Sequence, residues 1–356
     1  MTEEVRFEIR GGFGCITLDR QRALNALTLE IIRAMQVQID AWAEDPKVGA
    51  ILVEGAGERA FCAGGDVVAV RRSRLEEGSD GGATPQFILD FFGEEYRLNR
   101  TISELPKPYI ALLDGVTMGG GVGISVHGDF RIVTDRTLFA MPETGIGLFP
   151  DVGGGWFLPR CPGETGTYLA LTGTPVKAAD CLYVGAATHY VPSDGIDALR
   201  DALTGIAVVD DMAGAIGAVL AEFAAPAGDA PLAAHRDVID RAFGGDSIEE
   251  ILGALKETGG AFATETAELL GTRSPTSLKM TLELMRRGAR CASLAEDLEM
   301  EFALVQSFMT GADFFEGVRA LLVEKDRNPK WSPADLSGVG PEQVEAFFAR
   351  DGKAAL

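Results

Sequence analysis

The first half of the chain alternates short apolar runs with segments of helical periodicity. Residues 5–18, VRFEIRGGFGCITL, form two alternating runs around a Gly-Gly pair, which predicts a β-hairpin. Residues 28–45 then carry apolar side chains at helical spacing, and Thr28 is placed to cap that helix. AILVEGA (50–56) and YIALLDG (109–115) are typical of buried strands. Because strands and helices alternate, the pattern predicts an α/β fold with parallel strand pairing.

The pattern changes near residue 205, where alanine-rich helical segments replace the strands. SPTSLKMTLELMRRG begins with Ser274 as an N-cap and Pro275 at the first helical position. DFFEGVRALLVEKD places Asp313 three residues before Glu316, a variant of the capping box. EEGSDGGATP, residues 76–85, is polar and glycine-rich and predicts an exposed loop. We therefore predict a core over residues 1–205 and a helical C-terminal region over 206–356.

Composition and charge narrow the class of protein. The 356 residues carry a net charge of −21, which disfavours unspecific binding to nucleic acid or to an anionic membrane. No apolar run approaches the roughly 20 residues of a membrane span, and the start, MTEEVRFEIR, lacks the pattern of a signal peptide. We expect a soluble cytoplasmic protein. Its five scattered cysteines form no C-x-x-C and indicate reduced thiols: Cys15, Cys62, Cys161, Cys181 and Cys291.

Two glycine turns are candidates for ligand binding. Residues 60–66, AFCAGGD, form a strand-to-helix turn of small residues, where a backbone can approach a ligand closely. Residues 119–121 open a second helix in the same way. Neither a dinucleotide motif nor a phosphate loop is completed, and no G-x-S-x-G surrounds Ser125. Two separated turns can instead aim one N–H each at a single carbonyl oxygen, which would form an oxyanion hole.

The third candidate stretch is MPETGIGLFPDVGGGWF, in which Glu143 and Asp151 are the only acids among apolar and glycine residues. Burying a charge costs free energy, so such acids call for a reason. Taken alone, Glu143 is better explained as a helix-capping or surface acid. His127 and Cys62 have structural explanations as well, as a hydrogen-bonding histidine and a small packed side chain.

Taken together, the order and the sequences of these stretches resemble the crotonase (enoyl-CoA hydratase/isomerase) superfamily. The matching segments are RALNALTLE, AFCAGGD, KPYIALLDGVTMGGG and MPETGIGLFPDVGGGWFLPR, and the resemblance covers about residues 5–200. Within that superfamily, EEYRLNRTI, GISVHGDFRI, the PET…FPDVGGG loop and EKDRNPKWSPADL are similar to the 3-hydroxyisobutyryl-CoA hydrolase branch. The resemblance implies a crotonase-like ββα spiral core, with C-terminal helices that help to cover an acyl-CoA site.

The resemblance also implies roles for single residues. The backbone N–H groups of Gly65 and Gly120 would be the oxyanion donors. Glu143 would act at the thioester carbonyl, either as the nucleophile that forms an acyl-enzyme anhydride or as the base that activates water. Asp151 and Glu95 match acids of the hydrolase branch and would bind the 3-hydroxyl of the substrate, with Asp151 also a candidate for handling a proton.

Further contacts to the acyl-CoA are expected around the first turn. Ala63, Gly64 and Asp66 complete the AFCAGGD turn and are candidates for substrate binding. Arg22 precedes a segment that in this family commonly meets the nucleotide end of CoA. The other candidates for the CoA phosphates are basic residues whose default is solvated surface charge: Arg71, Arg72, Lys325, Arg327 and Lys330.

The implied function is hydrolysis of a short 3-hydroxyacyl-CoA thioester, with 3-hydroxyisobutyryl-CoA of valine catabolism as the expected substrate. No metal and no cofactor beyond the CoA of the substrate are implied, and a homo-oligomer is compatible with the resemblance. Hydratases of the superfamily use a second glutamate where this chain has Gly123, which puts hydration in doubt. The alternatives are an enoyl-CoA hydratase or isomerase, and a crotonase-fold binding protein that has lost catalysis.

Overall fold

The computed structural model describes residues 3–76 and 84–349. The chain separates into two compact units that interleave along the sequence. Unit 1 comprises the residues up to Gly65, Arg97–Ala140 and Pro175–Pro231, and unit 2 comprises Asp66–Tyr96, Met141–Thr174 and the chain from Leu232 onward. The single boundary predicted between residues 205 and 206 does not coincide with this division. Each unit is described by itself.

Unit 1 contains all the strands of the described chain. They are β1 (Val5–Arg10), β2 (Phe13–Leu18), β3 (Ala50–Gly55), β4 (Ala60–Cys62), β5 (Tyr109–Leu113), β6 (Val116–Met118), β7 (Phe130–Val133), β8 (Leu138–Ala140) and β9 (His189–Tyr190). A six-stranded sheet has the order β1-β2-β3-β5-β7-β9, and a three-stranded sheet has the order β4-β6-β8. The predicted hairpin is confirmed, because β1 and β2 pair antiparallel.

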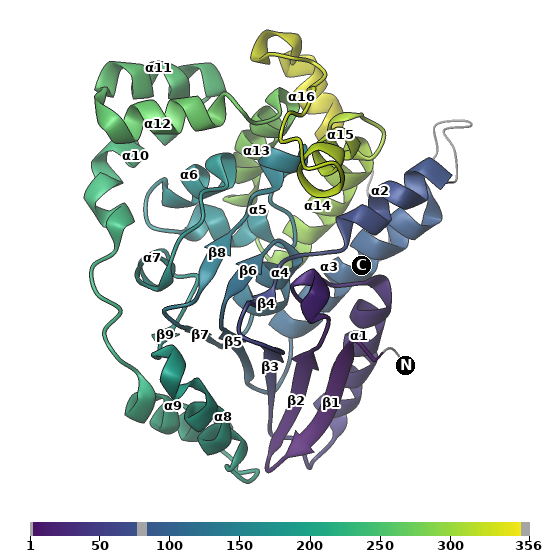
Figure 1. The fold of residues 1–356 in the computed structure, drawn as a ribbon, viewed down its shortest axis with the longest axis vertical. Helices are drawn as coiled ribbons and strands as arrows, with labels where there is room; N and C mark the ends of the chain where they lie inside the picture. The colour runs from purple at the N-terminus through teal and green to yellow at the C-terminus, as the bar shows by residue number, and fades with distance from the viewer. Residues whose placement is uncertain (1–2, 77–83, 350–356) are drawn as a thin grey trace. The chain divides into compact units, whose positions relative to one another are not determined.

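The remaining pairings of both sheets are parallel. The successive strand pairs β3/β4, β5/β6 and β7/β8 each send one strand to the large sheet and one to the small sheet. The chain thus repeats one β-β-α turn, which is the spiral core that the resemblance implied (Figure 1). The predicted α/β class with parallel pairing is confirmed.

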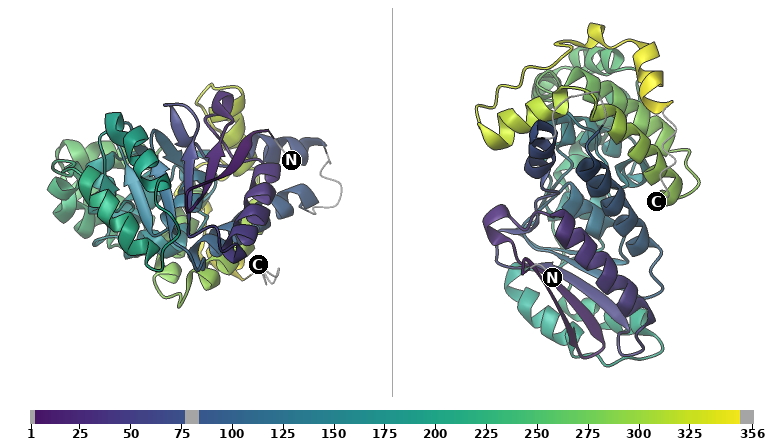
Figure 2. Two further views of the ribbon diagram at one scale, coloured as in Figure 1. Left: turned by 90° about the horizontal axis from the view of Figure 1, so that it is seen from below. Right: turned by 90° about the vertical axis from the view of Figure 1, so that its right-hand side faces the viewer.

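One face of the large sheet packs against α1 (Leu29–Glu44), as the right-hand view of Figure 2 shows. This helix begins where the sequence predicts, because the Thr28 side chain accepts a hydrogen bond from the amide of Ile31 at 3.2 Å. Trp42 of α1 lies so close to β2 that a methyl group added at Gly14 would lie 2.5 Å from its ring. A glycine is therefore needed in the strand for the helix to approach the sheet.

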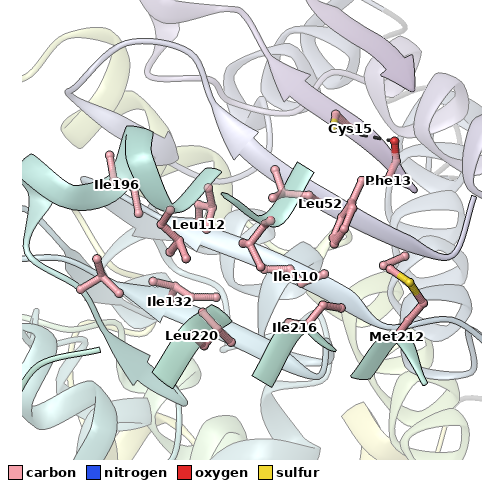
Figure 3. Close-up of a cluster of buried hydrophobic side chains, with 14 residues drawn as sticks. Phe13, Cys15, Leu52, Ile110, Leu112, Ile132, Ile196, Met212, Ile216 and Leu220 are labelled. Atoms are coloured by element: carbon pink, nitrogen blue, oxygen red, sulfur yellow. Dashed lines mark hydrogen bonds between the residues drawn. The ribbon is translucent and has the colours of Figure 1, made fainter. Parts of the chain in front are cut away.

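The opposite face of the same sheet packs against α8 (Ile196–Thr204) and α9 (Met212–Phe223). Alternate residues of each strand, such as Leu52 of β3 and Ile110 of β5, point to this side, as the period of two in a strand requires. Figure 3 shows them meeting Ile216 and Leu220 of α9. Cys15 lies in this core, and all five cysteines are free thiols, as predicted.

Unit 1 also contains α4 (Gly120–Val126) and α7 (Ala178–Tyr183), and α3 (Gln86–Ser103) passes from unit 2 into unit 1 after Tyr96. The described part of unit 2 consists of helices and loops. Its other helices are α2 (Val67–Glu76), α5 (Gly154–Phe157), α6 (Thr165–Thr172), α10 (Arg236–Phe243), α11 (Ile248–Thr258), α12 (Gly260–Leu270), α13 (Pro275–Gly288), α14 (Leu294–Phe308), α15 (Asp313–Val318) and α16 (Pro341–Phe348).

The start of α13 matches its prediction, but the predicted capping box at the start of α15 is wrong. Ser274 caps α13 by accepting from the Ser277 amide at 3.1 Å. Asp313 instead lies inside α15, where its carboxylate accepts the Ser274 hydroxyl at 2.6 Å and the Ser332 amide at 2.8 Å. Ser274 and Ser332 therefore bind the side chain that the local spacing predicts as the cap of the helix.

The predicted exposed loop at residues 76–85 falls largely on 77–83, which lie outside the described residues. None of the helices in residues 3–76 and 84–349 is long and apolar enough to cross a membrane.

Candidate active site

Glu143 lies where β8 ends, at the start of the short 3-10 helix η2 (Glu143–Ile146) in unit 2. The helix is fixed from both sides, because the Thr144 hydroxyl donates to the Leu171 carbonyl at 3.0 Å and the Ser274 amide donates to the Thr144 carbonyl at 3.2 Å. Glu143 is 5% exposed, and its Oε2 has no hydrogen-bond partner among the described residues. The turn therefore holds a buried acid with an unused acceptor.

Asp151 lies in the loop before α5 and is also 5% exposed. The Tyr96 hydroxyl of α3 donates to its Oδ2 at 2.8 Å. Burial raises the pKa of Asp151 from 3.8 to about 6, although the hydrogen bond from Tyr96 lowers it in part. A carboxyl with this pKa can both give and take a proton near neutral pH.

Glu95 precedes Tyr96 on α3 and is 2% exposed. Its Oε1 has no hydrogen-bond partner within the described chain. Burial, and after it the charge of Asp151, raises the pKa of Glu95 well above its usual range. The pKa of Glu143 is raised well above its usual range by the same two causes in the same order, and the charge of Glu95 adds to them. Unit 2 thus brings together the three acids predicted from the sequence to act in the site.

Three further polar residues of unit 2 belong to this cluster and were missed in the sequence. Tyr96 is one, and Asp297 and Glu301 of α14 are the others; both acids are 0% exposed. The Glu301 carboxylate accepts the amides of Gly153 at 2.8 Å and Gly155 at 2.9 Å. Because residues 294, 298, 302 and 305 form the apolar stripe of this helix, acids at 297 and 301 on the same side are a signal that the sequence does contain.

The two glycine turns belong to unit 1, where they lie next to each other. β4 and β6 pair in parallel, so the turn after Cys62 and the start of α4 follow at neighbouring strand ends. A methyl group added at Gly64, whose φ is +112°, would lie 3.8 Å from the Gly120 nitrogen, and one added at Gly121 would lie 2.2 Å from the Cys62 carbonyl oxygen. The close approach requires a glycine at position 121, whereas at position 64 the positive φ favours one.

Neither the Gly65 nor the Gly120 amide donates to a carbonyl among the turn and loop hydrogen bonds of the described chain. The Gly120 N–H is the first of α4, where an amide has no acceptor within its own helix. Cys62 beside this turn is fully buried, with its Sγ 3.7 Å from the Gly64 carbonyl oxygen, which agrees with a packed side chain.

The segment after Arg22 supports the first glycine turn. The Ala63 amide donates to the Leu24 carbonyl at 3.0 Å, and the Leu27 amide donates to the Gly64 carbonyl at 2.8 Å. Asn25, which is 1% exposed, donates to the carbonyl of Ala60 at 2.8 Å. The motif RALNAL therefore has a structural role in unit 1, in addition to its predicted role toward CoA.

The candidate phosphate ligands lie at the surface or already contact other groups of the protein. The side chain of Arg22 is 83% exposed and pairs with Glu4 at 2.9 Å. Arg71 donates to the Phe315 carbonyl at 3.1 Å, and Arg72 lies 3.7 Å from Glu76. The other three candidates are exposed: Lys325, Arg327 and Lys330. Asp66, the one acid of the first turn, caps α2 by accepting the Ala69 amide at 3.1 Å.

A family described as enoyl-CoA hydratase/isomerase matches residues 13–348 of the chain. The chain belongs to the enoyl-CoA hydratase/isomerase family. Solved structures that it resembles include a carnitinyl-CoA dehydratase from Mycobacterium thermoresistibile, with a TM-score of 0.89, 43% identity and coverage of 98% of this chain and 97% of that one. Another is an enoyl-CoA hydratase from Rhodobacter sphaeroides 2.4.1, with a TM-score of 0.88, 36% identity and coverage of 98% of both chains.

Curated relatives in this family include 3-hydroxyisobutyryl-CoA hydrolases that are named as mitochondrial. The protein from Danio rerio is 48% identical over 350 residues, which cover 97% of this chain and 89% of the relative. The protein from Homo sapiens is 44% identical over 359 residues, which cover 99% of this chain and 90% of the relative. Within the family, this chain has Gly123 buried in α4 at the position where a hydratase is expected to carry its second glutamate.

Proposed function

We propose that this chain hydrolyses the thioester bond of a short 3-hydroxyacyl-CoA, with 3-hydroxyisobutyryl-CoA as its substrate. The observation that carries the proposal is the cluster of Glu143, Asp151 and Glu95, three buried carboxyl groups in electrostatic contact. Such a cluster costs stability, so a role in chemistry accounts for it best. The hydrolase names of relatives that are 44–48% identical support the same reaction. With this substrate, the enzyme would act in valine catabolism.

The chemistry is assigned to Glu143. As a nucleophile, its carboxylate oxygen attacks the thioester carbon, the C–S bond breaks, and the CoA thiolate leaves and takes up a proton. Water then cleaves the resulting anhydride, which releases the 3-hydroxy acid and restores Glu143. As a base, Glu143 takes a proton from water while the water oxygen attacks the same carbon. Both routes consume one water and release one CoA.

Asp151 and Glu95 are assigned to the substrate's 3-hydroxyl. Glu95 Oε1 is a buried acceptor that has no partner among the described residues, and a hydroxyl donor would satisfy it. The raised pKa of Asp151, about 6, also suits it to protonate the departing thiolate. The backbone N–H groups of Gly65 and Gly120 are assigned to the thioester oxygen, where loss of one such donor typically raises a barrier by about 2.7–4 kcal/mol.

The remaining assignments belong to the same proposal. Ala63, Gly64 and Asp66 contact the acyl-CoA, and Arg22 binds at its nucleotide end. The reaction as written uses no metal and no cofactor beyond the CoA of the substrate. A cytoplasmic location and a homo-oligomer stay predictions; the relatives, by contrast, are named as mitochondrial.

A second candidate, hydration or dehydration of an enoyl-CoA, is favoured by the names of the two solved structures. One experiment separates the candidates: the protein is incubated with 3-hydroxyisobutyryl-CoA, isobutyryl-CoA and crotonyl-CoA, and both free thiol and enoyl absorbance are followed. We expect thiol release, fastest from 3-hydroxyisobutyryl-CoA. Loss of the crotonyl-CoA absorbance without thiol release would indicate a hydratase, and binding without either change would indicate a non-catalytic protein.

A further inference from the structure

Glu301 is a buried acid for which neither the hydrolytic steps nor the substrate contacts account. It lies on α14, is 0% exposed, and uses both carboxylate oxygens. Oε2 accepts the Gly153 amide at 2.8 Å, and Oε1 accepts the Gly155 amide at 2.9 Å. Each oxygen thus receives one backbone amide from the segment that directly follows Asp151. A side chain with a single acceptor oxygen cannot reproduce this arrangement.

The segment that Glu301 holds has a strained backbone. Val152 has a φ of +55° and Gly153 a φ of +86°, so two consecutive residues lie in the left-handed region. For a β-branched residue this conformation is a true outlier, and it persists only where the surroundings fix it. Val152 is 1% exposed, which leaves it little room to relax. The two hydrogen bonds to Glu301 hold the turn on its C-terminal side, in addition to the Gly154 amide, which donates to the Asp151 carbonyl at 2.8 Å.

The turn determines where the carboxyl group of Asp151 lies. Asp151 is the residue immediately before Val152, and its Oδ2 accepts the Tyr96 hydroxyl at 2.8 Å. If the peptide units of Val152 and Gly153 rotated toward ordinary backbone angles, the direction of the preceding residue would change with them. The two amides also favour the charged form of Glu301, which opposes the effects of burial and of the charges of Asp297 and Asp151 on its pKa.

We propose that Glu301 is a positioning residue for Asp151: its carboxylate clamps the Gly153 and Gly155 amides, holds the left-handed turn at Val152, and thereby orients Asp151 toward the substrate. The proposal rests on the proposed function, because it assigns Asp151 a role in reading the 3-hydroxyl. Glu301 itself touches no reacting atom. Its loss should therefore reduce the preference for a substrate with a 3-hydroxyl as well as the turnover rate.

Glu301→Gln is the test variant, because it keeps the size of the side chain but presents an NH2 group to one of the two amides. Glu299→Gln is the matched control, since Glu299 is an exposed acid on the same helix. Thermal unfolding identifies the variants that fold. If Glu301→Gln does not fold, Glu301→Asp takes its place, because its carboxylate is one methylene too short to reach both amides.

Two readouts are measured on wild type and variants: the hydrogen exchange of the Gly153 and Gly155 amides, and the kcat/KM ratio for 3-hydroxyisobutyryl-CoA against isobutyryl-CoA. We expect exchange of both amides to become about tenfold faster or more and the ratio to fall about tenfold in the Glu301 variant, with the Glu299 control unchanged. A purely structural defect would slow both thioesters equally. Unchanged exchange, or an unchanged ratio in a folded variant, would overturn the proposal, whereas failure of the wild type to release CoA would overturn the proposed function and leave the exchange result interpretable.

Discussion

Replacing Asp151 by asparagine should stabilise the protein, and the gain should grow with pH. Asparagine has nearly the shape of aspartate, and its side-chain oxygen can still accept the Tyr96 hydroxyl, which lies 2.8 Å from Asp151 Oδ2. The substitution therefore removes the buried charge while keeping the packing. An acid that is held for chemistry in a site 5% exposed to solvent is expected to impose such a cost on the fold.

The magnitude follows from the pKa of Asp151, which the fold raises from 3.8 to about 6. Because the folded state holds this proton more tightly than the unfolded chain, the free energy of unfolding falls as pH rises through this window and then levels off. With one pKa unit worth about 1.4 kcal/mol, the ionised carboxyl costs about 3 kcal/mol at pH 8 and about 1 kcal/mol at pH 4.5. Loss of the Asp151 charge also lowers the raised pKa values of Glu95 and Glu143, which adds to the gain.

The assay is urea unfolding of wild type and Asp151→Asn at pH 4.5, 6 and 8, and the free energy of unfolding is compared at each pH. Asp210→Asn, at an exposed aspartate, is the control and should show no such trend. The variant should exceed wild type by about 3 kcal/mol at pH 8 and by about 2 kcal/mol less at pH 4.5. A variant that is no more stable than wild type at pH 8, or a gap that does not depend on pH, would refute the reasoning.

Three further predictions concern the reaction and the glycine turns. Because Gly123 provides no carboxylate, the wild-type protein should hydrate crotonyl-CoA about 100-fold more slowly than it hydrolyses its thioester substrate; comparable rates, by enoyl absorbance and thiol release, would contradict this. If Glu95 and Asp151 bind the 3-hydroxyl, kcat/KM should favour 3-hydroxyisobutyryl-CoA over isobutyryl-CoA by about 10- to 100-fold. Alanine at either position should reduce that preference. A wild-type ratio near one would show that neither acid has this role. Gly121→Ala should destabilise the fold by about 3 kcal/mol or more, because the added methyl would lie 2.2 Å from the Cys62 carbonyl oxygen; an unchanged melting temperature would count against this close approach.

Local sequence patterns predicted much of the fold because they depend on near neighbours. The cap at Thr28, the hairpin before it and the cap at Ser274 each need only a few consecutive residues, and the structure confirms them. Asp313 had the right spacing for a capping box, but Ser274 and Ser332 bind its carboxylate instead. Those partners come from distant segments, which local spacing cannot reveal.

The candidate site divides in the same way. Glu143 and Asp151 stood out because they interrupt an apolar, glycine-rich stretch, and burial of both is what that context predicts. Glu95 was found through resemblance rather than from its spacing. The position of Glu301 on the apolar side of its helix is a signal of burial, but its role depends on contacts with Gly153 and Gly155, almost 150 residues earlier in the chain. Such contacts become visible only once the helix and the turn are placed in space.

Release of free CoA from 3-hydroxyisobutyryl-CoA by wild type and Glu143→Gln tests the central claim most directly. The wild type should release one thiol for each thioester consumed. The variant, which removes the charge but keeps the shape, should have a kcat at least about 100-fold lower while remaining folded and at least as stable as the wild type, because burial raises the pKa of Glu143. Near-normal turnover by a folded Glu143→Gln protein, or no thiol release by the wild type, would contradict the account.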